Sequence, residues 1–151
     1  MSLQIGALHV RRSIFIDALP SRVWEEFATH SRVAAWLSHG HVLHTFESRA
    51  GGRVEFSVAI GGIERRFGGR VVDYAPPQGL SLEINWHDPD WATPVPNFWT
   101  FRLTPLYGGT HVELFHHGFE RLGRDAALTL QGFEQGWDVK HLVALRAIVE
   151  G

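Results

Sequence analysis

Cysteine is absent from this sequence of 151 residues, and methionine occurs only at position 1. The lack of cysteine excludes disulfides, a thiolate nucleophile, iron–sulfur clusters and cysteine-ligated zinc. Lysine is almost absent too, because Lys140 stands alone beside 13 arginines. A Schiff-base mechanism would therefore depend on that one residue.

A strong excess of one charge is also lacking. The 14 basic and 16 acidic residues give a net charge of −2 without long runs of one sign, so we expect no nucleic-acid partner. No stretch approaches the roughly 20 apolar residues of a membrane span, and residues 1–10 lack the basic and apolar regions of a secretion signal. We therefore expect a cytoplasmic protein without a membrane span.

What the chain does contain is 10 histidines, 6 tryptophans and 10 phenylalanines, in a composition that is 44% hydrophobic and 20% charged. Length and composition are typical of a single folded domain over 1–151. Residues 1–3 and 150–151 resemble expression-vector remnants. Full protonation of the ten histidines would change the net charge from −2 to +8, so surface electrostatics should change strongly around pH ~6.5.

The N-terminal part predicts one strand and two short helices. Residues 8–17 mix β-branched and polar side chains with partial alternation, which indicates a strand. Pro20 suits the first turn of a helix over about 20–29. Ser31 is a plausible N-cap for a second helix that ends at Trp36.

Apolar side chains then recur at every second residue between 41 and 118. The alternation is clearest over 54–60, 80–86, 99–103 and 112–116. It is typical of antiparallel strands with one apolar and one polar face, and we expect six strands here. Glycine and proline pairs between these segments supply turns or bulges.

The last part of the chain predicts one long helix with an apolar stripe. The stripe consists of Ala126, Leu130, Phe133, Trp137, His141, Ala144 and Ile148. A second stripe on roughly the opposite side is either packed within the chain or a partner surface; it contains Gly132, Gly136, Val139 and Val143.

A sheet with one apolar face needs a cover, and this helix is the only predicted element that is large enough. We therefore predict an α+β fold in which a curved antiparallel sheet wraps around a long C-terminal helix, with two short helices after the first strand. A gap between the sheet, the helix and the two short helices would make the interior partly a pocket.

Five segments, spread over about 10–149, carry a resemblance to a known family. They lie at 16–27 (IDALPSRVWEEF), 32–36 (RVAAW), 67–77 (FGGRVVDYAPP), 103–119 (LTPLYGGTHVELFHHGF) and 135–142 (QGWDVKHL). Together they resemble the START/polyketide-cyclase-like (SRPBCC) superfamily, and within it the homologues of the activator of the heat-shock chaperone ATPase.

The resemblance implies a helix-grip fold and a hydrophobic cavity for lipid-like or aromatic small molecules. Some members of the superfamily are cyclases or aromatases, and others are carriers. Many members carry a second aromatic residue after the tryptophan of the second helix. Here Leu37 follows Trp36, so we expect a differently shaped pocket entrance.

Eight residues are candidates for ligand binding. Six are aromatic residues at predicted inward positions, where large rigid rings line a pocket or simply fill the core: Trp36, Phe56, Trp86, Trp99, Phe133 and Trp137. The other two are His116, which follows the inward Val112 and Leu114, and His141 on the helix stripe. Both histidines are candidates for a ligand contact or a general base; the alternative is a hydrogen-bonded core histidine. Asp138 is placed to raise the pKa of His141, unless both lie on the surface.

Other polar groups give weaker indications. The spacing of His39, His41 and His44 suggests a metal site, but ligands and outer-shell partners are missing and 41–44 is expected in an outer strand, so we predict no metal. Among Arg65, Arg66 and Arg70, one would point inward in some registers. The segment 87–97, with His87, Asp88 and Asp90, is either a lid or a solvated loop.

Three functions stay open. The first is non-catalytic binding of a small hydrophobic or aromatic molecule in a cavity between the sheet and the C-terminal helix. The second is a cyclase-, aromatase- or hydrolase-like enzyme that uses His116 with His141 or a loop aspartate. The third is a protein-interaction module, as a homodimer or a chaperone-related domain, that uses the second helix stripe and Trp91. We favour the first, with no cofactor.

Overall fold

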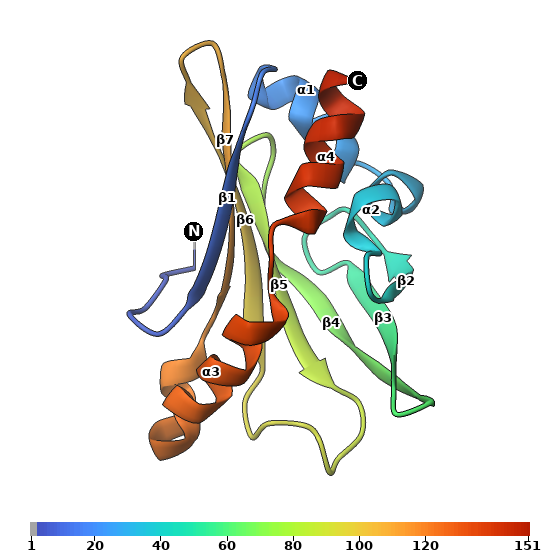
Figure 1. Ribbon diagram of the computed structural model, residues 1–151, viewed down its shortest axis with the longest axis vertical. Helices are drawn as coiled ribbons and strands as arrows, with labels where there is room; N and C mark the ends of the chain where they lie inside the picture. The colour runs from blue at the N-terminus through green and yellow to red at the C-terminus, as the bar shows by residue number, and fades with distance from the viewer. Residues whose placement is uncertain (1–2) are drawn as a thin grey trace.

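The computed structural model describes residues 3–151, so residues 1 and 2 of the suspected vector remnant lie outside the described part. A single seven-stranded antiparallel sheet has the order β1-β7-β6-β5-β4-β3-β2 (Figure 1). Its strands are β1 (Val10–Ile16), β2 (Val42–Phe46), β3 (Arg53–Ile60), β4 (Ile63–Ala75), β5 (Gly79–Trp86), β6 (Asn97–Leu106) and β7 (Gly109–His117).

Helices lie on one face of this sheet (Figure 1). They are α1 (Pro20–Trp24), α2 (His30–Leu37), α3 (Ala126–Gly136) and α4 (Lys140–Glu150), with the short 3-10 helices η1 (Glu25–Phe27) and η2 (Phe119–Asp125). The curved sheet, the paired short helices and the helical C-terminus confirm the predicted α+β helix-grip fold. No helix within residues 3–151 has the length and apolar character that crossing a membrane requires.

The period-two pattern places side chains on the two faces as the sequence predicts. On β6, Trp99 and Phe101 are buried against the helices, with His116 opposite Trp99 in the neighbouring strand. On the outer face, the Oγ1 atom of Thr100 lies 2.6 Å from Nε2 of His117 and 2.8 Å from Oγ of Ser81. His116 and His117 therefore belong to different environments.

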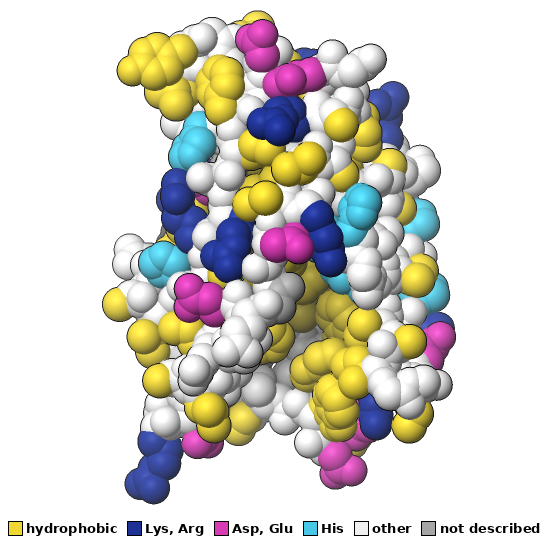
Figure 2. Space-filling model, viewed as in Figure 1, with side chains coloured by type: hydrophobic (Ala, Val, Ile, Leu, Met, Phe, Trp, Pro, Cys, Tyr) yellow, Lys and Arg dark blue, Asp and Glu magenta, His cyan; other side chains and the backbone are white. Residues whose placement is uncertain are grey.

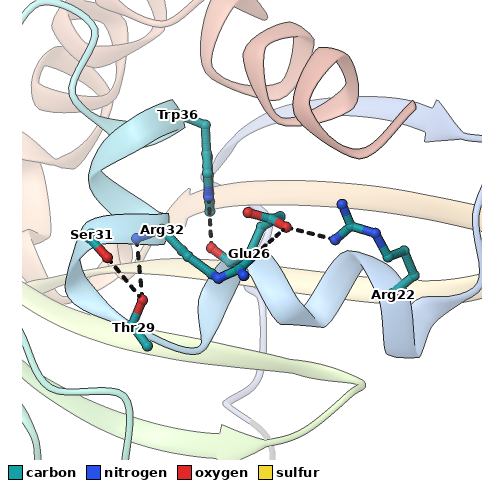
Figure 3. Close-up of polar contacts among 6 residues, drawn as sticks. All are labelled: Arg22, Glu26, Thr29, Ser31, Arg32 and Trp36. Carbon is teal, nitrogen blue, oxygen red and sulfur yellow. Dashed lines mark hydrogen bonds and ion pairs between the residues drawn. The ribbon is translucent and has the colours of Figure 1, made fainter. Parts of the chain in front are cut away.

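The two short helices are joined by a buried carboxylate (Figure 3). Glu26 accepts hydrogen bonds from Arg22 at 2.6 Å and from Arg32 at 2.9 Å, and its backbone carbonyl accepts one from the Trp36 indole at 2.9 Å. The second helix is capped by Thr29, whose hydroxyl accepts from the Arg32 N–H. The predicted cap at Ser31 is wrong by two residues, because the helix already starts at His30.

The long C-terminal helix is interrupted, which corrects the expectation of one continuous helix. Trp137 adopts an extended conformation (φ −93°, ψ 136°) between α3 and α4. Its indole N–H donates to Nδ1 of His116 at 2.9 Å, and Arg12 donates to the carbonyls of Glu134 and Trp137 at 3.2 and 3.0 Å. Because Arg12 bonds two carbonyls at the break, the interruption leaves fewer backbone groups unsatisfied.

Candidate ligand-binding site

A cavity of about 270 Å³ lies between the sheet, the start of α4 and the link from α2 to β2. Its aromatic walls are formed by Phe67, Trp86, Trp99, Phe133 and Trp137, and aliphatic side chains come from Val58, Ile60 and Ile84. In Figure 2 this face is hollowed in its lower half, with hydrophobic side chains inside the hollow.

The interrupted helix explains the hollow. Among the described side chains of α3, only Ala126 is buried, whereas Leu128 is 73% exposed. Figure 1 shows α3 near the β1 and β7 edge of the sheet, while α4 continues over the other end. The sheet face below Trp137 thus lacks the cover that α4 provides above it, and a space remains.

Aromatic contacts make the cavity walls stiff. Phe67 packs within 5.2 Å of Trp86, measured between ring centroids, and Trp99 packs edge-on against Trp137 at 5.1 Å. Phe56, on the neighbouring strand, stacks on Phe67 at 5.0 Å. Such pairs add about 0.5–1.5 kcal/mol each beyond area burial, which holds the rings in place around the space.

His116 joins three elements at the cavity wall. Its Nδ1 accepts from the Trp137 indole, so Nε2 carries the proton and donates to Oδ1 of Asn97 at 2.7 Å. Burial, with a smaller contribution from the neighbouring His117, lowers the pKa of His116 to about 3. The imidazole is neutral with both nitrogens occupied, and it orients Trp137 and the start of β6.

Six of the eight predicted site residues line the cavity: Trp86, Trp99, His116, Phe133, Trp137 and His141. Trp36 does not; it is fully buried in the core, with its ring centroid 4.9 Å from that of Phe27. Phe56 does not line the cavity either; it is fully buried beside Phe67, its partner on the neighbouring strand. Sequence alternation gives the face of a residue but not whether a neighbour fills the space in front of it.

Sequence reasoning did not assign three basic groups of the lining to the ligand site: His39, His41 and Lys140. Residues 41–44 were expected in an outer strand, yet His41 precedes β2, with its ring centroid 5.3 Å from that of His141. His44 points elsewhere and contacts Oγ of Ser57 at 2.6 Å. No group of three or more metal-ligating side chains in the described part of the chain is arranged to hold a metal ion.

The histidines at this end of the cavity are shifted toward the neutral form. Burial lowers the pKa of His141 to about 4, and the adjacent His41 contributes in the same direction, while a backbone hydrogen bond at Trp36 opposes it. Burial also lowers the pKa of His41. The expectation that Asp138 raises the pKa of His141 is wrong, since the Asp138 carboxylate accepts from the Lys140 N–H at 2.7 Å instead.

None of the three candidate arginines lines the cavity, although Arg65, opposite Val58, starts from the same face of the sheet. Arg65 forms an ion pair with Asp88 at 2.8 Å and lies 4.6 Å from the Trp91 ring centroid, which ties the 87–97 loop to β4. Arg66 pairs with Glu64 at 3.1 Å, and Arg70 lies 3.9 Å from Glu83. Residues 87–96 do not contribute to the described lining.

The second stripe of the C-terminal region faces outward. Val139 and Val143 are both exposed, at 43% and 40%. Gly132 has open space where a Cβ would lie. The sequence left two alternatives for this stripe, packing within the chain or a partner surface. In the described part of the chain the stripe is not packed.

Comparison with known proteins places the chain among related sequences. The family model of Activator of Hsp90 ATPase homolog 1-like proteins (AHSA1) matches residues 17–150. None of the curated proteins matches the chain. The matched range includes all strands from β2 onward and every cavity residue described above.

Solved structures resemble the chain over nearly its whole length. A protein from Chromobacterium violaceum is 24% identical, with a TM-score of 0.72 over 97% of this chain and 99% of that one. The Aha1 dimer from Colwellia psychrerythraea is 16% identical, with a TM-score of 0.62 over 94% and 96%. DynU16, from the dynemicin biosynthetic locus, is 19% identical with a TM-score of 0.66, over 96% of this chain but 48% of DynU16. At these identities the likeness shows a shared fold.

Proposed function

The chain belongs to the family of Activator of Hsp90 ATPase homolog 1-like proteins, and we propose that its cavity binds a small hydrophobic or aromatic molecule without catalysing a reaction. The family assignment confirms the resemblance drawn from the sequence. The observation that carries the proposal is the 270 Å³ space with five aromatic walls on a folded scaffold. Concave, mostly apolar sites with few polar groups are typical of small-molecule binding.

The size of the cavity favours a compact ligand. The volume of about 270 Å³ lies just below the roughly 300–1,000 Å³ of pockets that hold drug-sized ligands. This suits a ligand with one or two rings better than a long acyl chain. The flat walls formed by Trp86, Trp99 and Trp137 suit an aromatic body.

The state of His116 supports binding over catalysis. A general base needs a lone pair within reach of the proton that it abstracts. The Nδ1 lone pair of His116 is used by Trp137, and Nε2 donates to Asn97. With a pKa of about 3, the imidazole is also a weak base near neutral pH.

Fluorescence titration with 2-naphthamide tests the proposal, because three tryptophans line the cavity. We expect saturable quenching, and a rise in unfolding free energy of about 2.7 kcal/mol at a probe concentration of 100 Kd. The substitution Val58→Phe adds a ring at the cavity wall and should weaken binding at least about tenfold, a loss of about 1.4 kcal/mol.

Val42→Phe is the matched control, since Val42 is exposed on β2 outside the lining. It should bind the probe as the parent chain does. Quenching that does not saturate, or that is unchanged by Val58→Phe, would contradict binding in this cavity. The interaction-module alternative stays a hypothesis, based on the outward stripe with Val139 and Val143 and on a structural neighbour that is a dimer.

A further inference from the structure

One end of the cavity gathers basic side chains from two segments that are far apart in the sequence. His39 and His41 come from the link before β2, and Lys140 and His141 begin α4. The His141 ring centroid lies 5.8 Å from that of His39 and 5.3 Å from that of His41. Gly40 (φ +85°) makes the turn between the two link histidines in a left-handed conformation.

The same end holds buried polar atoms that the folded chain does not satisfy. Nε2 of His41, Nδ1 of His141 and the indole Nε1 of Trp99 are buried and have no hydrogen-bond partner among residues 3–151. All three side chains line the cavity, and the His41 and Trp99 centroids are 6.0 Å apart. Buried polar groups are nearly always hydrogen-bonded, so three unpartnered nitrogens around one cavity indicate a missing polar partner. By contrast, both nitrogens of His116 are paired.

The charge at this end is positive and uncompensated. Lys140 is the only charged residue in the described lining, which contains no Asp or Glu. It forms no ion pair within the described part of the chain, and its ammonium lies beside Gly40 at the cavity rim. A basic rim beside a hydrophobic hollow is the pattern that an amphipathic anion recognises.

We propose that this end is a carboxylate-recognition site, so that the ligand is a small amphipathic acid with an aromatic or apolar body. The carboxylate lies among Lys140, His41 and His141, and the body fills the part walled by Phe67, Trp86 and Trp99. This inference rests on the proposed binding function and names its ligand class. A carboxylate accepts hydrogen bonds from the Lys140 ammonium and the Trp99 indole, and from each imidazole that is protonated.

The histidines give the site a pH dependence with a defined sign. The groups that face them are His39, His41, Lys140 and His141 themselves, with neutral His116 deeper in the wall, while Asp138 is outside the lining. A bound carboxylate opposes the effect of burial and raises the pKa of His41 and His141. Protons are therefore taken up on binding, and affinity for the acid increases as the pH falls from 8 to 6.

Calorimetric titration with 2-naphthoate and its neutral isostere 2-naphthamide tests the inference. We expect the parent chain to bind the acid at least about tenfold more tightly than the amide, and only the acid to bind more tightly at pH 6 than at pH 8. Lys140→Gln should weaken acid binding about tenfold and amide binding by much less, because only the acid loses a charge–charge interaction. His141→Gln should reduce the pH dependence, because it removes one titrating group.

Arg146→Gln is the matched control, since it removes a positive charge from α4 outside the lining. It should leave both affinities unchanged. If the amide binds but the acid has no advantage, or if Lys140→Gln weakens both probes equally, carboxylate recognition is wrong while the binding function stands. If neither probe binds, both proposals fail.

Discussion

The concave face of the sheet has a filled half and a hollow half, although the same strands build both. On β6, the Phe101 centroid lies 5.6 Å from that of Phe27 and 5.5 Å from that of Trp36, and all three rings are buried without a gap between them. Two residues earlier on the same face, Trp99 borders the cavity. The strand pattern is identical, so the difference comes from what covers each half.

The cover differs because of one break in the chain. Above Trp137, α4 inserts Leu142 and Leu145, both fully buried, toward the sheet. Below it, α3 is directed away; the Trp137 indole donates to His116, and Arg12 donates to the carbonyls of Glu134 and Trp137, which holds the break. The filled half is thus stabilised mainly by apolar burial, and the hollow half depends more on polar contacts of buried groups.

A fall in pH should produce the largest effect on stability, and this effect should come from the buried groups of the hollow half. The buried histidines all lie at the hollow half or behind it, and burial lowers the pKa of His116 to about 3 and of His117 and His141 to about 4. In the unfolded chain they titrate near pH 6.5, so the unfolded state binds more protons as the pH falls below that value. Stability should then decrease by roughly 2 kcal/mol per histidine between pH 7 and pH 5, as measured by urea unfolding.

The variant His117→Gln isolates the contribution of one histidine to this loss of stability. It keeps a group that can hydrogen-bond Thr100 but removes one titrating site, so the loss between pH 7 and pH 5 should shrink by about one third. Equal unfolding free energies of the parent chain at the two pH values would show that these histidines are not held neutral in the folded state.

A matched pair of phenylalanine truncations compares the halves directly. Phe27→Ala removes a fully buried ring from the filled half and should cost about 3–5 kcal/mol of unfolding free energy. Phe133 is half-buried on α3 and borders the cavity, so Phe133→Ala should cost less than about 2 kcal/mol. Denaturant titration of both variants measures the difference. Equal losses would mean that the cavity closes or that α3 packs more tightly than described.

The features that follow from local patterns were predictable from the sequence. The alternation at Trp99 and Phe101, and the neighbouring His116 and His117, fix which side chains face inward because the strand period is two. The break at Trp137 was not predictable, because the apolar stripe continues through it. What stops the helix is contact with His116 and with Arg12, which is 125 residues away in the chain.

The same reasoning explains which parts of the candidate site were missed. The sequence predicts that Trp36 and Trp99 both point inward. Only in the folded chain do Phe27 and Phe101 pack against Trp36, which places it in the filled core. His41 was assigned to an outer strand because nothing local indicates that the link before β2 passes the start of α4. Such contacts depend on the tertiary arrangement, which a single sequence does not contain.

The smallest expected effect comes from stiffening the cover of the hollow half. Gly132 lies within α3 with nothing within 4 Å of the position of a Cβ, and its backbone is not in the left-handed region. Gly132→Ala should therefore stabilise the protein by about 0.5–1 kcal/mol, since alanine restricts the unfolded chain and favours the helix. Gly123→Ala is the contrast, because its φ of +66° strains any side chain and should make that variant less stable. If Gly132→Ala leaves the unfolding free energy unchanged while Gly123→Ala lowers it, then η2 is fixed but α3 is not a persistent helix, and the hollow half is held by Trp137 and His116 alone.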